Sequence, residues 1–151
     1  MRQRQLIRMG SRTIVQTAIG TLWGRDCIFL DRLSMPDTST LVLKGTINTG
    51  IVRQFVPPEQ MPTSEELPYV LRFNGVLATH ILELDTWQSQ HDSEDNAFMG
   101  SSFEELVDSR WLSSLAGKVT PNHRHFAVLT YDDVIDVICR DYTLSFNPKT
   151  A

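Results

Sequence analysis

The sequence predicts an α+β domain in which one main helix, at about residues 102–116, packs on a mostly antiparallel sheet of hairpins. Three observations predict this class. Residues 102–116 have helical spacing, residues 123–142 form a hairpin pattern, and the remaining strand-like runs alternate with turn signals instead of helices. The patterns leave open whether the sheet curls into a barrel.

The predicted helix begins at Ser102, which forms a capping box with Glu105 three residues later. Gly117 is placed to take the left-handed conformation after the last turn, so the helix should end near Ala116. Its apolar side chains recur at steps of three and four residues, which indicates one buried side: Phe103, Leu106, Val107, Trp111 and Leu115.

The predicted hairpin joins residues 123–130 to residues 134–142 around Asp132-Asp133. If those two aspartates are the whole loop, position 129 faces 136, 127 faces 138 and 125 faces 140. A slip of one residue would exchange the two faces. The predicted core face carries Phe126, Val128, Ile135, Val137 and Cys139. The opposite, open face carries His123, His125, Leu129, Tyr131, Asp136, Arg140 and Tyr142.

Other segments complete the predicted sheet. Strand-like runs occur at 13–15, 19–23 and 27–33, followed by a turn at 36–38. Two further hairpins are predicted, with 40–47 and 51–56 flanking residues 48–50, and 69–73 and 76–84 flanking Asn74-Gly75. Residues 57–67 and 88–100 read as polar loops. We expect a single domain over 1–151, with a basic arm at 1–12 and a tail at 147–151.

Composition favours a globular protein, because 41% of the 151 residues are hydrophobic and 21% are charged. No apolar run reaches ~18 residues and no secretion signal is evident, so we expect a cytoplasmic protein without a membrane segment. Cys27 and Cys139 stand in apolar contexts that favour reduced core thiols, although a single bridge between them stays open.

Charge is unevenly distributed along the chain. Residues 1–25 hold five arginines and no acidic residue, and removing these five charges from the net −4 leaves −9 on the remainder. The arm fits a solvated segment folded back on an acidic body, a phosphate- or partner-binding arm, or a targeting segment. The acidic body disfavours nucleic-acid binding.

Chemical motifs are sparse. The sequence has no nucleophile elbow, phosphate-binding glycine loop, C-x-x-C or H-E-x-x-H, and no cofactor is predicted. His123 and His125 fall on the same side of a strand, where they could bind a metal if Asp136 or His80 converged with them. Histidines paired with carboxylates or backbone groups are the commoner arrangement.

Three segments together resemble small bacterial α+β proteins of unknown function. They are the strand YVLRFNGVLA, the helical SRWL and the hairpin HRHFAVLTYDDVIDVI, and they cover about the C-terminal half of the chain. The resemblance implies an α+β fold and a partner-binding or immunity-type role. It implies no catalytic residue.

Two functions follow as expectations. The first is a non-catalytic interaction module that binds another protein or a second copy of itself through an open face made of His123, His125, Tyr131, Asp136, Arg140 and Tyr142. The alternative is a small-molecule- or metal-binding enzyme with its site over His123, His125 and Asp136.

Overall fold

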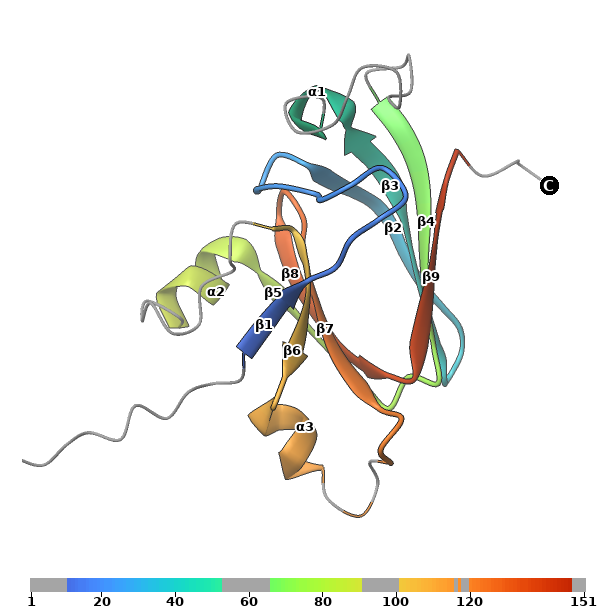
Figure 1. Cartoon of the computed structure of the whole chain (residues 1–151), viewed down its shortest axis with the longest axis vertical. Coiled ribbons are helices and arrows are strands. Elements are labelled where there is room, and N and C mark those ends of the chain that lie inside the picture. Colours follow the sequence, from blue (N-terminus) through green and yellow to red (C-terminus); the bar gives the residue numbers. More distant parts are fainter. Residues whose placement is uncertain (1–10, 53–65, 91–100, 116, 118–119, 148–151) are drawn as a thin grey trace, which may run out of the picture.

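The computed structural model describes residues 11–52, 66–90, 101–115, 117 and 120–147, which fold mainly into β-strands (Figure 1). The strands are β1 (Ser11–Ile14), β2 (Ile28–Asp37), β3 (Thr40–Asn48), β4 (Glu66–Asn74), β5 (Ala78–Glu83), β6 (Phe103–Val107), β7 (Arg124–Leu129), β8 (Asp133–Cys139) and β9 (Asp141–Phe146). Three short helices accompany them: α1 (Thr49–Val52), α2 (Leu84–Gln90) and α3 (Arg110–Ser114).

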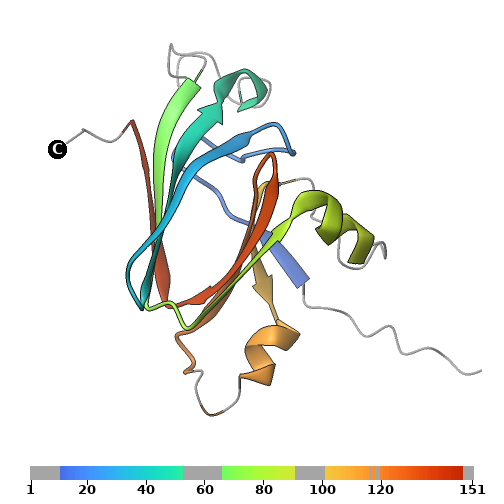
Figure 2. The same cartoon turned by 180° about the vertical axis from the view of Figure 1, so that it is seen from behind.

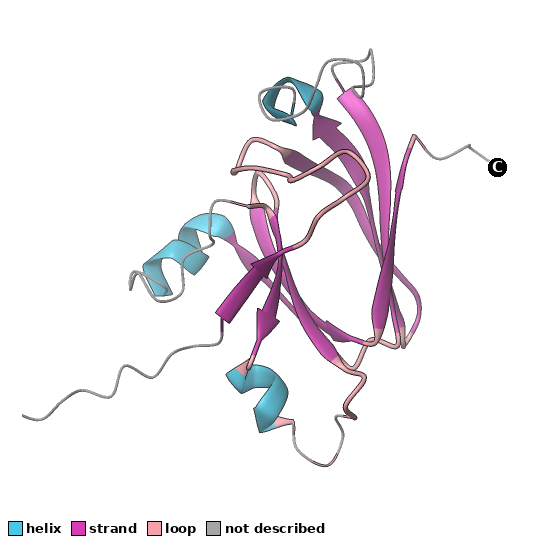
Figure 3. Cartoon of the chain, in the orientation of Figure 1, coloured by secondary structure: helices cyan, strands magenta, loops and turns pink. Residues whose placement is uncertain are grey.

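The strands form two antiparallel sheets. One has the order β1-β6-β7-β8-β5 and the other has the order β2-β3-β4-β9. The sheets face each other and come together where β4 leads into β5 and β8 leads into β9 (Figures 1 and 2). The predicted α+β class with one main helix is therefore wrong: the described chain is mainly β, with two separate sheets and no closed barrel (Figure 3).

The core fills the space between the two sheets. Alternating burial along β4 sends Leu67, Tyr69, Leu71 and Phe73 inward, as expected for strands with one buried face. From the opposite sheet, Phe103 and Phe126 meet Phe73 with ring centroids 6.4 and 6.0 Å away. This shared apolar cluster joins the sheets into one core.

The predicted helix at 102–116 is replaced by strand β6 and the single-turn helix α3. Ser102 does not cap a helix, since its hydroxyl donates to the carbonyl of Gly24 and its amide donates to the carbonyl of Leu22. Asp108, with φ of 59°, breaks the chain direction after β6. Apolar residues spaced three and four positions apart are typical of a helix. The same spacing is equally compatible with a short strand, a break and one helical turn. Gly117 does take a positive φ of 87°.

The final hairpin forms with the predicted core face and a different register. Phe126, Val128, Ile135, Val137 and Cys139 all lie in the core cluster, which confirms the predicted core face. The observed pairs are Leu129–Val134, Ala127–Asp136 and His125–Ile138, so each residue pairs two positions earlier than predicted. The pairing differs because the loop is Tyr131-Asp132, closed by the Thr130 amide donating to the Asp133 carbonyl and the Asp133 amide donating to the Thr130 hydroxyl. A shift of two residues leaves the faces unchanged.

The other two predicted hairpins are wrong where the structure describes them. After β3 the chain enters α1, and residues 53–56 of the expected partner strand lie outside the described residues. Asn74-Gly75 joins two different sheets, because β4 pairs with β3 and β9 whereas β5 pairs with β8. The strand expected at 19–23 is reduced to isolated bridges, and the turn at 36–38 lies at the end of β2. The expected loops at 57–67 and 88–100, the arm at 1–12 and the tail at 147–151 lie largely outside the described residues.

Cys27 and Cys139 are both buried and free. Burial raises the pKa of the Cys27 thiol to about 11 and that of the Cys139 thiol to about 12. Within the described residues, no helix has both the length and the apolar character needed to cross a membrane.

Candidate functional site

A pocket of about 390 Å³ lies on the five-stranded sheet, lined by residues of five strands and two helices. Side chains of alternate residues on β7 and β8 fill the core, so the pocket residues His125 and Asp136 project from the opposite, outer face. Helices α2 and α3 lie on this outer side, away from the four-stranded sheet (Figures 1 and 2). The lining residues are Arg12, Thr79, His80, Trp87, Leu106, Ser109, Arg110, Trp111, His125 and Asp136.

A chain of three polar side chains runs along one wall of the pocket. Ser109 Oγ lies 2.6 Å from His125 Nδ1, and His125 Nε2 lies 2.7 Å from Asp136 Oδ1. The carboxylate can only accept, so the proton on Nε2 is donated to Asp136. In neutral His125 the Nδ1 atom is then the acceptor, and the Ser109 hydroxyl donates to it.

The local backbone fixes all three members of this chain. Ala127 pairs with Asp136, and His125 lies two residues before Ala127 on the same face, so the imidazole reaches Asp136 diagonally across the sheet. Ser109 caps α3, where its Oγ accepts from the Leu112 amide at 3.1 Å. The Ser109 side chain is thereby held against the imidazole, and Ser109 and His125 are only 3% and 5% exposed.

Aromatic rings supply the apolar part of the pocket. The Trp111 ring meets the His125 ring edge to face at 5.2 Å and lies 6.5 Å from the His80 ring. Trp87, on α2, is 8% exposed and packs with Leu84 and Val134. Indole walls beside an imidazole and a carboxylate give the pocket both a stacking surface and directional polar groups.

A buried ion pair adjoins the pocket. Arg12 on β1 reaches Glu104 on β6, with Nη1 3.3 Å from Oε1, and the Glu104 side chain has no exposed surface. The two strands pair so that Arg12 lies opposite Leu106, and Ile14 lies opposite Glu104. Arg12 thus contributes to the pocket lining while the charge of Glu104 is compensated next to it.

The six residues predicted to form one open face occupy several places. Only His125 and Asp136 come together in the pocket. His123 is buried, and its Nδ1 accepts from the Thr120 amide at 2.9 Å. Tyr142, on β9, packs between the sheets with its ring 5.1 Å from that of Phe103.

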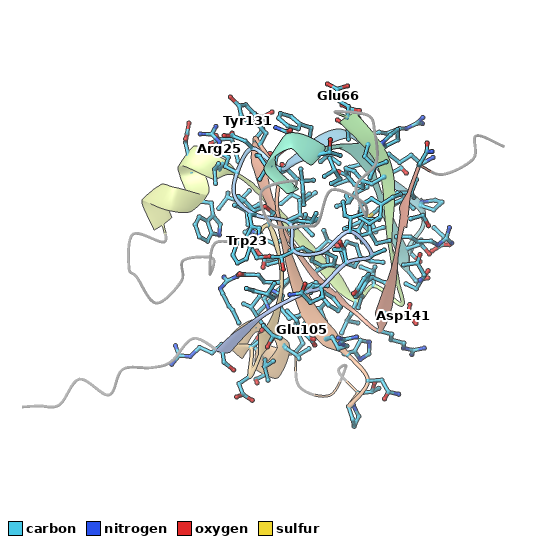
Figure 4. All side chains as sticks on the ribbon, turned by 45° about the horizontal axis from the view of Figure 1, so that its top comes forward. Trp23, Arg25, Glu66, Glu105, Tyr131 and Asp141 are labelled. Carbon is cyan, nitrogen blue, oxygen red and sulfur yellow. The ribbon has the colours of Figure 1, made fainter. Side chains whose placement is uncertain are left out.

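The remaining two residues of that face do not line the pocket. Tyr131 is at the tip of the last hairpin, where its ring stacks on Phe29 at 5.2 Å and lies under the guanidinium of Arg25 at 4.8 Å. Figure 4 shows Tyr131 and Arg25 side by side at one end of the molecule. Arg140 is exposed and lies against Gly75.

The alternative metal site on His123, His125 and Asp136 is not assembled in this structure. Among the described residues, no group of three or more His, Cys, Asp or Glu side chains converges as a metal site would require. Both nitrogens of His125 are engaged with Ser109 and Asp136, and the Nδ1 of His123 is engaged with Thr120.

Sequence reasoning missed Ser109, Trp111 and Arg12 as pocket residues. Ser109 lies inside the predicted helix 102–116, although a serine directly before Arg-Trp-Leu is also a good N-cap for a new helix. As the N-cap of α3, Ser109 places its side chain against His125 on β7, which is the next strand along the chain. No sequence signal links Arg12 to the site, because its partner Glu104 lies 92 positions away.

Comparison of the chain with protein-family models, with curated proteins and with solved structures found no match.

Proposed function

We propose that this protein binds a small organic molecule in the pocket on the outer face of the five-stranded sheet. The observation that carries the proposal is the His125–Asp136 pair, which is largely buried and yet lines a pocket with Trp111 beside it. Proteins commonly bind small molecules in pockets of this size that combine aromatic walls with a few fixed polar groups.

The energetics of the pair support a binding role. Placing an imidazole and a carboxylate where their side chains are only 6% and 17% exposed costs desolvation free energy, and a hydrophobic pair of similar volume would often be as stable. Polar groups kept in such a position are well suited to orient a ligand. Ser109, His125 and Asp136 form a linked polar wall of the pocket, which suits a ligand with a carbonyl, hydroxyl or carboxyl group.

The pocket walls indicate the shape of the ligand. Trp87 and Trp111 come from different helices and line the same pocket, so a flat ring can contact indole surface there. Arg110 is exposed and lines the pocket as well, which favours a ligand with an anionic or strongly polar edge. We therefore expect a compact aromatic molecule bearing an oxygen-rich group.

The test is a ligand-observed NMR screen of small aromatic acids, phenols and esters against the protein and two variants. Asp136→Asn keeps the shape of the side chain but removes the charge that holds His125 in its tautomer. Asp141→Asn is the matched control, because Asp141 is an exposed aspartate on the other sheet. We expect binders whose affinity falls about 10-fold in Asp136→Asn and is unchanged in Asp141→Asn, as for loss of one charge-assisted hydrogen bond.

The proposal fails if no member of such a set binds, or if the binders respond equally to both aspartate variants. Loss of fold is separated from loss of binding by recording the thermal unfolding of each variant. A folded Asp136→Asn protein that binds as the wild type does would remove the pocket from consideration.

A second candidate is self-association through the edge strand β5, in line with the expected interaction module. Among the described strands β5 pairs with β8 alone, and Ile81 on β5 is 45% exposed with Leu77 just before the strand at 38%. An unpaired strand edge with exposed apolar side chains favours antiparallel pairing with the same strand of a second copy.

Sedimentation velocity tests this second candidate. If copies pair through β5, Ile81→Lys should shift the protein to the monomer, since lysines would then face each other across the new interface. Met35→Lys on β2 is the matched control, because Met35 is equally exposed at 50% and lies on the other sheet. A wild-type protein that is monomeric at high concentration would exclude the interface.

Both cysteines are buried and free, as suits a reducing compartment, and we propose the cytoplasm as the site of action. Cell fractionation that finds the protein in an oxidising compartment would contradict this location.

A further inference from the structure

We propose that Ser109, His125 and Asp136 form a nucleophile–base–carboxylate chain that hydrolyses small aryl esters bound in the pocket. This inference rests on the proposed function, since it requires the pocket to admit a ligand. It names the substrate class and adds a reaction to the binding role.

The geometry supplies the arrangement that nucleophilic catalysis needs. A serine hydroxyl is a weak nucleophile unless a base is within hydrogen-bond reach, and here Oγ is 2.6 Å from an imidazole nitrogen. The base is oriented in turn by a carboxylate at 2.7 Å. In the template triad the serine contacts Nε2 and the carboxylate contacts Nδ1, so here the two imidazole nitrogens exchange partners while the roles of base and orienting carboxylate are both filled.

The surroundings of Ser109 favour ionisation of its hydroxyl during attack. The Leu112 amide donates to Oγ at 3.1 Å, so one hydrogen bond is already in place to stabilise negative charge on that oxygen. Ser109 is 3% exposed and lines the pocket, so a substrate reaches it through the pocket and not from open solvent. Arg110 lines the same pocket and offers positive charge to the carbonyl oxygen.

The reaction proceeds in two balanced halves. Ser109 Oγ attacks the ester carbonyl carbon while its proton passes to His125 Nδ1, and the bond from that carbon to the aryl oxygen then breaks as Nδ1 returns the proton to the leaving phenol. Water attacks the acyl-serine with His125 again taking a proton. The acid is released and the proton returns to Oγ. Asp136 stabilises the imidazolium in both halves and stays ionised.

Ester substrates with an aromatic leaving group match the pocket walls. The aryl group can contact Trp87 or Trp111 inside the pocket of about 390 Å³, which places the ester carbonyl near the polar wall.

The test uses 4-nitrophenyl acetate and mass spectrometry of the protein quenched during turnover. We expect an acetyl group on the peptide that contains Ser109 and hydrolysis at least about 100-fold faster than in Ser109→Asn, as is typical when a base-assisted step is removed. Asparagine is as good an N-cap as serine, so Ser109→Asn keeps α3 capped while removing the nucleophile. Ser113→Ala, an exposed position on the same helix, is the matched control and should keep full activity.

His125→Gln tests the base separately. It should abolish acetylation of Ser109, because the hydroxyl then has no base to take its proton during attack. Acetyl groups found only on lysines or other surface residues, or equal rates in wild type and Ser109→Asn, would overturn the inference.

Binding of the product 4-nitrophenol, measured by saturation-transfer NMR, separates the two proposals. If 4-nitrophenol binds the wild type and weakens in Asp136→Asn while Ser109 is never acetylated, the hydrolytic inference falls and the binding function stands. If 4-nitrophenol does not bind and no acetylation occurs, the inference falls, and the ligand screen alone decides the binding function.

Discussion

Glu104 is fully buried, and Arg12 is the cation beside it, with the two charged atoms 3.3 Å apart. A buried carboxylate is tolerated only when its charge is compensated, and removing one partner of such a pair usually costs more than the pair contributes. Both residues also make other interactions. The contribution of the Arg12–Glu104 pair to the free energy of unfolding can be measured directly.

Arg12→Met should therefore lower the free energy of unfolding by about 3 kcal/mol, because it removes the Arg12 cation from the buried Glu104 carboxylate while keeping the length of the side chain. Urea denaturation followed by tryptophan fluorescence measures the change. The double variant Arg12→Met, Glu104→Gln should lose less than Arg12→Met alone, since the buried charge is gone as well. Equal losses in both proteins would show that the pair contributes through packing and not through charge.

Strand alternation explains which parts of the candidate site the sequence could indicate. Alternation along 123–142 correctly separated His125 and Asp136 from the core residues, because a strand places alternate side chains on opposite faces. The alternation could not indicate that α3 would cover this face. The surface that was predicted to be open is therefore a wall of the pocket. Tyr142 left the face altogether, because the chain changes sheets at Arg140 and strand parity does not continue across that break.

At the scale of elements, the predicted strands were more accurate than their partners. β2, β3, β4, β7 and β8 occur close to where β-branched and aromatic runs predicted them. Asn74-Gly75 predicted a hairpin, and Gly75 does adopt a positive φ of 61°, but the turn carries the chain from one sheet to the other. Local turn chemistry fixes the backbone conformation and does not decide which strand becomes the neighbour.

Gly45 shows how one element depends on its neighbour at atomic contact. It lies opposite Leu30 where the β2–β3 register shifts, and a Cβ atom there would stand 1.8 Å from the Phe29 carbonyl oxygen. Because β2 and β3 are hydrogen-bonded to each other, their backbone atoms cannot move apart to relieve such an overlap without breaking the ladder. The register shift in β2 therefore requires a residue without a side chain at position 45 of β3.

Gly45→Ala is expected to lower the free energy of unfolding by at least ~2 kcal/mol, at the upper end of the cost of overpacking a well-packed site. Thermal and urea denaturation measure the loss. Gly50→Ala in α1 is the control, because a Cβ there meets only the Asn48 side-chain oxygen at 3.1 Å, and we expect a change within ~1 kcal/mol. A Gly45→Ala protein as stable as Gly50→Ala would mean that β2 moves freely against β3.

For the whole molecule, stability depends on one core shared by two sheets, and that core holds ionisable groups. Cys27, Cys139 and Tyr69 all belong to the cluster between the sheets. Burial raises the pKa of all three groups. The pKa rises to about 11 for Cys27 and to about 12 for Cys139, and the pKa of Tyr69 also rises well above its ordinary value. These groups remain protonated in the folded chain at a pH where they ionise in the unfolded chain.

Alkaline pH should consequently destabilise the whole fold. A thiol in the unfolded chain ionises near its ordinary pKa of 9.0, whereas the folded thiols need about two to three pH units more. Above pH 9 the unfolded chain thus binds fewer protons than the folded chain, and the free energy of unfolding falls as pH rises. Urea denaturation at about pH 8 and about pH 10 measures this slope.

Cys139→Ala should make the slope shallower, whatever it does to stability at neutral pH. Tyr69→Phe should change the slope only at higher pH, because the ordinary pKa of tyrosine is 10.0. A free energy of unfolding that stays constant across this range would mean that the two thiols are not enclosed between the sheets.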